Sequence, residues 1–215
     1  MKVKALIFDM DGVIMDSMWM WKDLAVNYLK SLGKDPDPYI NRRLQTMGMK
    51  QASEVLQKEY HVDKTPEEIA NDITELITGY YVEEVQPKLH AAEAMAKLRD
   101  SGVRMCLATA TDRPLVEAAM KRTGIFESFE FILTTTEVGH GKDKPDIFNR
   151  AAEKMGIDPG DMLVIEDSLL AIQTANAAGF NTCGVYDESQ KPLFPKVSAA
   201  ADVTVESLLE IIDLI

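Results

Sequence analysis

The 215-residue sequence lacks the features that would place it in a membrane, nucleic-acid-binding or secreted class. No apolar stretch approaches the roughly 18 residues of a membrane-spanning helix, and no lysine- and arginine-rich block forms a nucleic-acid footprint. The two cysteines, Cys106 and Cys183, lie within apolar segments, which favours buried thiols over a disulfide. Asp9 and Asp11 interrupt the N-terminal apolar run, so no signal peptide is visible. We expect a soluble, cytoplasmic protein that binds neither nucleic acid nor membranes.

Acidic residues outnumber basic ones by 35 to 23, which gives a net charge of −12. A field of this sign repels phosphorylated molecules, so local cations or a metal would have to overcome it at any phosphate site. Hydrophobic residues make up 46% of the chain, enough for a substantial core in one large domain or a core with a smaller insert. We expect a monomer by default.

The segment that follows the first apolar strand is almost purely helical. Its apolar spacing predicts helices over residues 18–32, 39–46, 50–60 and 66–83. The sequence Thr65-Pro66-Glu67-Glu68 is a typical helix start. We therefore predict an inserted helical domain at 16–85 and a second domain made of 1–15 and 86–215.

The remainder of the chain alternates between short apolar strands and helices. Strands are expected at 3–8, 103–108, 129–133, 162–165, 182–185 and near 203, and helices at 91–101, 113–123, 145–156, 168–178 and from 207. Residues 191–201 read as a loop. This alternation is typical of a parallel sheet covered by helices on both faces.

Polar residues follow the predicted strands at the edge where parallel sheets bind ligands. They are Asp9 and Asp11, then 109–111, then Lys142 in a loop, then 166–168. Together they supply acids for a metal, donors for an anion and a cation. This combination is suited to phosphoryl transfer.

Two carboxylates at i and i+2, Asp9 and Asp11, can point to the same side as a strand ends. Gly12 follows and permits a sharp turn. Bringing two acids together is unfavourable unless a cation shares the space. With oxygen ligands alone, Mg²⁺ is the natural candidate.

Each cluster also has a purely structural explanation when it is taken alone. Thr109 could cap the next helix, and residues 166–168 could form a helix N-cap and first turn. Lys142 could be a solvated loop lysine, with Lys144 as a competitor two residues away.

The four clusters in this order resemble the haloacid dehalogenase superfamily, especially phosphatases similar to β-phosphoglucomutase. The matching segments are 9–17, 107–109, 141–142 ahead of 144–148, and 165–168. The resemblance covers essentially the whole chain. It implies an α/β fold, namely a Rossmann-like, doubly wound parallel sheet with an inserted α-helical cap.

The resemblance also implies roles for individual residues. Asp9 would be the nucleophile that becomes an aspartyl phosphate, and Asp11 the general acid and then the base that activates water. Lys142 would restrain nucleophile and phosphate. The remaining assignments are Thr109 and Ala110 for phosphate, Trp21 and Gly48 for substrate, and Asp9, the Asp11 carbonyl, Asp167 and Glu166 for Mg²⁺.

Several positions depart from the family's pattern. Asp11 argues against a dehalogenase, which has no leaving alkoxide to protonate. Trp21 falls where β-phosphoglucomutase has a histidine, and Gln51 falls near where it has a phosphate-binding arginine. We therefore expect a Mg²⁺-dependent phosphomonoesterase acting on a small phosphorylated metabolite, with a phosphosugar mutase as the alternative. A phospho-acceptor signalling domain is a third reading, which chain length, the insert and Asp11 disfavour.

Overall fold

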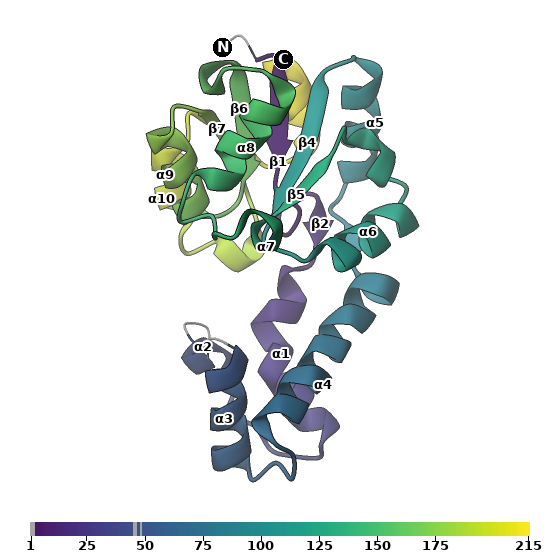
Figure 1. The fold of residues 1–215 in the computed structure, drawn as a ribbon, viewed down its shortest axis with the longest axis vertical. Helices are drawn as coiled ribbons and strands as arrows, with labels where there is room; N and C mark the ends of the chain where they lie inside the picture. The colour runs from purple at the N-terminus through teal and green to yellow at the C-terminus, as the bar shows by residue number, and fades with distance from the viewer. Residues whose placement is uncertain (1–2, 45–46, 48) are drawn as a thin grey trace. The chain divides into compact units, whose positions relative to one another are not determined.

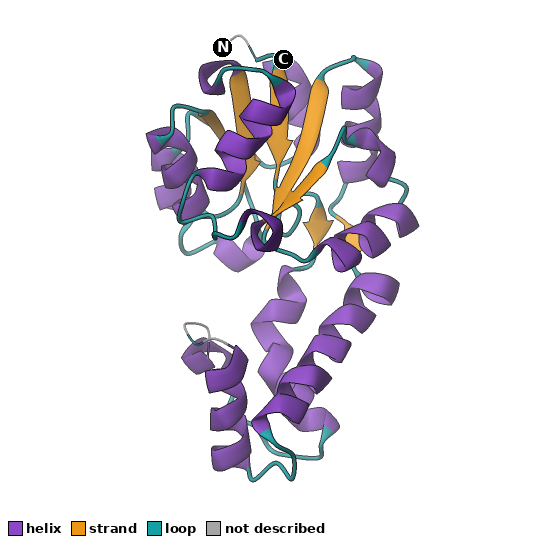
Figure 2. Cartoon of the chain, viewed as in Figure 1, coloured by secondary structure: helices purple, strands orange, loops and turns teal. Residues whose placement is uncertain are grey.

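A computed structural model describes residues 3–44, 47 and 49–215. The chain divides into two compact units, one formed by Met1–Ser17 with Val85–Ile215 and the other by Met18–Glu84. Figure 1 shows the elements of each unit, and Figure 2 shows that the strands belong to the first while the second is helical. Each unit is described here by itself.

The first unit, which we call the core unit, contains a six-stranded sheet in the order β5-β4-β1-β6-β7-β8, parallel throughout. The predicted α/β fold with a parallel sheet is confirmed. The strands are β1 (Ala5–Phe8), β4 (Arg104–Thr109), β5 (Ile132–Thr134), β6 (Met162–Glu166), β7 (Asn181–Val185) and β8 (Val203–Val205). Because β1 lies between β4 and β6, residues that follow β1 have the ends of both neighbours beside them.

The helices of the core unit alternate with these strands, as Figure 1 shows. They are α5 (Ala91–Asp100), α6 (Arg113–Arg122), α7 (Thr135–Val138), α8 (Asp146–Met155), α9 (Leu169–Ala177) and α10 (Phe194–Ala200), with 3₁₀ turns at Phe126–Ser128, Pro159–Asp161, Glu188–Gln190 and Leu208–Leu214. Alternate residues of β1, Ala5 and Ile7, join a buried cluster with Phe148 of α8 and Ala171 of α9. All four residues of β1 are fully buried, as expected for a strand covered on both faces.

The predicted loop at 191–201 is wrong, because α10 occupies most of it. Pro195 lies in the first turn of this helix, where its missing N–H costs no intrahelical bond. Val197 is fully buried. A single buried apolar side chain in seven residues is too weak a pattern to identify a helix from sequence, and packing against α9 stabilises it.

The second unit, which we call the helical unit, consists of α1 (Met18–Ser31), α2 (Ile40–Leu44), α3 (Met49–Tyr60), α4 (Pro66–Gly79) and a π-helical turn at Tyr80–Glu84. The predicted start of α4 is confirmed: the side chains of Thr65 and Glu68 form a capping box, with Pro66 in the first turn. Ile69, Ile73 and Ile77 recur every four residues and are buried. This apolar stripe forms the core of the helical unit.

Two short strands that the sequence analysis did not predict flank the helical unit in the sequence, one before it and one after it. They are β2 (Met15–Asp16) and β3 (Gln86–Pro87), which pair antiparallel with Met15 opposite Pro87. Arg122 donates a hydrogen bond to the carbonyl of Val85. The two chain segments that connect the units, which we call the crossings, are therefore paired with each other at their core-unit ends.

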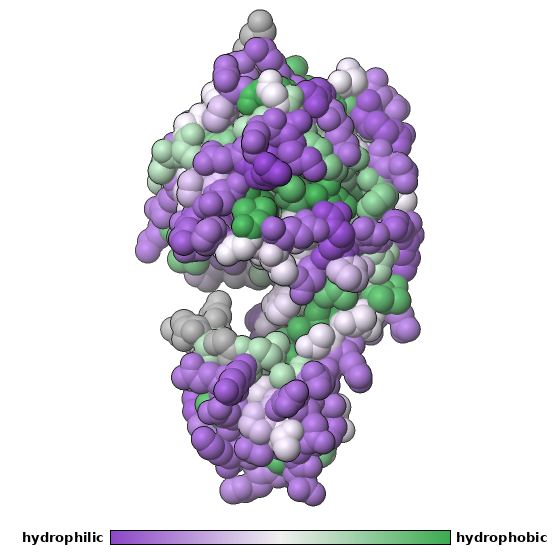
Figure 3. All heavy atoms as spheres, in the orientation of Figure 1, coloured by the Kyte–Doolittle hydropathy of each residue, from purple (hydrophilic) through white to green (hydrophobic). Residues whose placement is uncertain are grey.

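No helix in the described ranges combines the length and the apolar character that crossing a bilayer requires. Hydrophilic side chains cover most of the face that Figure 3 displays, with smaller apolar areas among them.

Candidate active site

The site begins where β1 ends. The backbone N–H of Asp9 donates to the carbonyl of Ile165 at 3.0 Å, which continues the pairing of β1 with β6 by one residue. This bond places Asp9 beside Glu166 and Asp167 at the carboxyl edge of the sheet. The three side chains each offer a carboxylate oxygen, and these oxygens lie within 4.8 Å of one another.

Asp11 lies at the start of a tight turn. Gly12 has a φ of +75°, a conformation that glycine adopts without steric cost. The N–H of Gly12 donates to Met15, and the N–H groups of Ile14 and Met15 both donate to Met10. The turn reverses the chain directly into β2.

Two hydroxyl groups hold the Asp11 carboxylate. Ser17 Oγ donates to Asp11 Oδ1 at 2.5 Å, and Thr111 Oγ1 donates to Oδ2 at 2.6 Å. Neither residue was assigned to the site from sequence, although Ser17 lies within the matching segment 9–17 and Thr111 within the polar cluster 109–111. The Thr111 hydroxyl, two residues after Thr109, could have been noticed in the sequence. Its partner Asp11 lies 100 residues away, so the contact itself could not be predicted.

Lys142 enters from the loop between α7 and α8. Its ammonium lies 2.6 Å from Asp9 Oδ1 and 2.5 Å from Glu166 Oε1. The contact with Glu166 is a hydrogen bond, and the contact with Asp9 is a close ion pair. Lys144 is exposed. The structure thus brings Lys142, rather than its neighbour, to the acids.

Glu166 and Asp167 are bound differently. Glu166 Oε2 accepts the N–H groups of Asp167 and Ser168, at 3.0 and 3.1 Å, in addition to the bond that Oε1 accepts from Lys142. Among the residues that the structure describes, buried Asp167 Oδ2 has no hydrogen-bond donor. An unsatisfied buried carboxylate oxygen is costly. Among hard oxygen donors it fits a divalent cation such as Mg²⁺, so the residues present are compatible with the metal that the sequence predicts.

Crowded acids in a buried site shift their protonation. Burial, reinforced by the charge of Glu166, raises the pKa of Asp9 to about 7, although Lys142 acts in the opposite direction. Burial and the charges of Glu166 and Asp9 likewise raise the pKa of Asp167. For Lys142, burial alone would lower the pKa, but the charges of Asp9 and Glu166 outweigh it and raise it. The ammonium is therefore a permanent cation in this site.

The other predicted residues lie in different surroundings. Thr109 is fully buried and its Oγ1 accepts the N–H of Thr111 at 3.1 Å, while Ala110 is exposed at the same strand end. Trp21 is partly exposed on α1 in the helical unit. Gly48 lies outside the described residues. Core-unit residues predicted for the site thus converge on one edge of the sheet.

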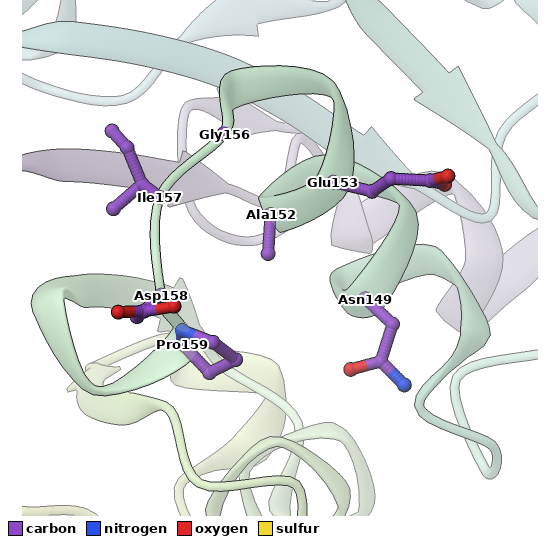
Figure 4. A pocket seen from close by; sticks show the side chains of 7 residues that line it. All are labelled: Asn149, Ala152, Glu153, Gly156, Ile157, Asp158 and Pro159. Carbon is purple, nitrogen blue, oxygen red and sulfur yellow. The ribbon is translucent and has the colours of Figure 1, made fainter.

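A hollow of about 330 Å³ lies elsewhere on the core unit, and Figure 4 shows its lining. Its wall is formed where α8 ends, at Gly156, and by Asp158 and Pro159, which lead into the amino end of β6. Asp9, Glu166 and Asp167 follow carboxyl ends of strands. The hollow therefore lies at the opposite edge of the sheet from the acids.

Comparison with known proteins agrees with this geometry. Residues 3–179 match the sequence profile of the haloacid dehalogenase-like hydrolases. The chain belongs to this family, and the predicted resemblance is confirmed.

Two characterised relatives show the range of proteins within it. The chain is 27% identical over 210 residues to the bifunctional riboflavin kinase/FMN phosphatase of Arabidopsis thaliana, covering 96% of this chain but only 54% of that protein. It is 28% identical over 220 residues to hexitol phosphatase B of Escherichia coli, covering 98% of this chain and 95% of that protein.

A solved structure has the same fold. A β-phosphoglucomutase-like protein of Thermotoga maritima superposes with a TM-score of 0.86 at 23% identity, over 99% of this chain and 100% of that one.

The raised pKa of Asp9 predicts how the metal-free protein responds to pH. The folded state takes up a proton between about pH 4 and 7 that the unfolded chain, with an aspartate pKa near 3.8, does not. Stability therefore falls as pH rises through this window. In EDTA, the melting temperature of the wild type should fall between pH 5.5 and 7.5 by roughly 5 °C more than that of Asp9→Asn. Equal slopes for both proteins would contradict the raised pKa.

Proposed function

We propose that this protein is a Mg²⁺-dependent phosphomonoesterase that hydrolyses a small phosphorylated metabolite through an aspartyl phosphate. The observation that carries the proposal is the Lys142 ammonium on Asp9, beside the unsatisfied oxygen of Asp167. A carboxylate can attack a phosphate dianion only if positive charge offsets their repulsion. The phosphatase activities named for the two relatives support the same reaction class.

In the first step, an oxygen of Asp9 forms a bond to phosphorus as the ester P–O bond breaks. The electron pair of that bond goes to the leaving oxygen, which takes a proton from Asp11. In the second step, Asp11 takes a proton from water, whose oxygen attacks phosphorus and releases Asp9. Ser17 and Thr111 hold the Asp11 carboxylate, and the Thr109 hydroxyl with the Ala110 backbone would bind phosphate oxygens.

The carboxylates of Asp9 and Asp167 and the carbonyl of Asp11 would hold Mg²⁺, with Glu166 next to them. When bound, the metal supplies positive charge that stabilises the phosphate in the transition state. Glu166 already accepts three hydrogen bonds, including that of Lys142. Its main role in the proposal is therefore to orient the lysine.

The helical unit, residues 18–84 by its internal contacts, is proposed to act as a cap that selects the substrate. Its sequence differs from the pattern of β-phosphoglucomutase at Trp21 and Gln51. Without the arginine expected near Gln51, a second phosphate has no clamp at that position, which favours hydrolysis over phosphoryl migration.

Turnover tests the proposal directly. The wild type with Mg²⁺ should hydrolyse p-nitrophenyl phosphate over many cycles and lose activity in EDTA. A panel of sugar, hexitol and flavin phosphates, scored for inorganic phosphate, then identifies the substrate class. If an isomeric phosphosugar forms without release of phosphate, the activity is that of a mutase and not of a phosphatase. A single stoichiometric burst would indicate a phospho-acceptor.

The roles of the two aspartates can be separated by trapping the phosphoenzyme. Asp9→Asn removes the nucleophile, so no adduct should form. Asp11→Asn keeps the nucleophile, and p-nitrophenolate leaves with little help from an acid. Intact-mass spectrometry after rapid quenching should therefore show an added phosphoryl group on Asp11→Asn alone. The opposite pattern would exchange the two roles.

Lys142 and Lys144 form a matched pair for testing the cation. Lys142→Ala should reduce kcat by on the order of 10²-fold or more, since a charge acting in the transition state is lost. Lys144→Ala should change kcat by less than about threefold, because that side chain is exposed. Melting temperatures measured with Mg²⁺ control for folding. A larger loss in Lys144→Ala would reverse the assignment.

Tryptophan fluorescence tests the cap, because both tryptophans of the chain, Trp19 and Trp21, belong to the helical unit. Adding Mg²⁺ with beryllium fluoride, a mimic of the aspartyl phosphate, should change the emission of the wild type. The change should be smaller in Trp21→Phe than in Trp19→Phe. The Trp19 ring of the wild type already packs edge-on against Tyr80 within the helical unit, so we expect Trp21 to report the change. An unchanged emission spectrum would remove Trp21 from the substrate site.

A further inference from the structure

Lys88 connects the turn that carries Asp11 to a distant loop of the core unit. Its ammonium donates to the carbonyl of Gly12 at 2.8 Å, to the carbonyl of Tyr186 at 2.7 Å and to Asp187 Oδ2 at 3.0 Å. A lysine ammonium has three donors, so the three bonds match its full capacity. The side chain is only 19% exposed. Its place directly after β3 also puts it beside the second crossing between the units.

These bonds constrain the backbone on both sides of Gly12. The N–H of Gly12 donates to Met15 at 3.0 Å, which fixes the peptide unit between Asp11 and Gly12. Lys88 fixes the next peptide unit through the Gly12 carbonyl, and its own backbone N–H donates to Ile14 at 2.8 Å. The orientation of Asp11 therefore depends on a side chain 76 residues beyond Gly12.

Lys88 also compensates a further buried acid near the site. Asp187 follows β7, is 5% exposed, and its charge contributes to the raised pKa of Asp167. Burial alone would raise the pKa of Asp187, but hydrogen bonds from Ser189 and Lys88 outweigh it and hold the pKa below its ordinary value. Asp187 is thus an anion that anchors Lys88 in place.

We propose that Lys88 is a positioning residue for proton transfer: by holding the Gly12 carbonyl against the loop after β7, it sets Asp11 for donation to the leaving oxygen. The inference rests on the proposed role of Asp11 as general acid. When the ester P–O bond breaks, its electron pair goes to the leaving oxygen, and the proton of Asp11 neutralises it. A displaced Asp11 penalises basic leaving groups and spares weakly basic ones.

Two aryl phosphates of similar shape measure this effect. Phenyl phosphate releases phenolate, which is a stronger base than the p-nitrophenolate released from p-nitrophenyl phosphate. Hydrolysis of phenyl phosphate therefore depends more on proton donation by Asp11. In Lys88→Met, kcat/KM for phenyl phosphate relative to p-nitrophenyl phosphate should fall by roughly tenfold or more. Both substrates are measured on one sample, so the fraction of folded enzyme cancels from the ratio. A general structural defect lowers both activities equally.

Further variants complete the experiment. Asp11→Asn should give the largest fall in the ratio of the two kcat/KM values. Adding Lys88→Met to the Asp11→Asn variant should leave that ratio unchanged within about twofold. Lys97→Met is the matched control, an exposed lysine paired with Glu93 on α5, and should keep the wild-type ratio. If Lys88→Met does not fold, Lys88→Arg replaces it, because the planar guanidinium keeps the charge but not the geometry of the three bonds.

The outcomes separate this inference from the proposed function. An active wild type whose ratio is unchanged in the Lys88 variant overturns the role of Lys88 alone. A wild type that hydrolyses neither aryl phosphate overturns the phosphatase itself, and the positioning role with it. A further fall of the ratio in the Asp11→Asn background would show that Lys88 acts by another route, which also overturns the inference.

Discussion

The site depends on the electrostatic repulsion among carboxylates that the fold confines to one edge of a sheet. Asp9, Glu166 and Asp167 lie together with little exposure to water, an arrangement that is unfavourable unless cations offset it. Lys142 supplies one positive charge, shared between Asp9 and Glu166. Asp167 Oδ2 has no hydrogen-bond partner in the described part of the chain, and a divalent cation would satisfy it. In the proposed mechanism, the same compensation would prepare a carboxylate for attack on an anion.

The parallel sheet determines which residues share this edge. Because β1 is flanked by β4 and β6, the residues after β1 have Thr109 on one side and Glu166 on the other. Asp9 extends the pairing with β6 through its backbone N–H, whereas Asp11 leaves the sheet in a turn closed by Gly12. The two acids therefore have different surroundings, one among charges and one among hydroxyl groups, which suits the two distinct roles proposed for them.

A second layer of contacts supports the residues that would carry out the chemistry. Ser17 and Thr111 hold the Asp11 side chain, while Glu166 holds Lys142 through one oxygen and the following backbone through the other. Lys88 adds the connection from the turn to the loop after β7. Such contacts restrict the orientation of reactive groups, and small errors in orientation reduce rates strongly.

The sequence by itself determined the alternation of strands and helices in the core unit, the parallel sheet and the polar residues that end the strands. Apolar runs identify buried strands, and a parallel sheet brings their ends to one edge, so Asp9, Thr109 and Glu166 could be grouped without coordinates. The family resemblance already favoured Lys142 over Lys144, and its contact with the acids agrees with that prediction. Tertiary structure alone decided that Thr111 and Ser17 hold Asp11, and that Lys88 reaches Gly12. It also produced the β2–β3 pair and α10, whose sequences are too short to show a period. The physical reason is the same in each case: these features rest on contacts between residues distant in sequence, and only the packed chain brings such residues within hydrogen-bonding distance.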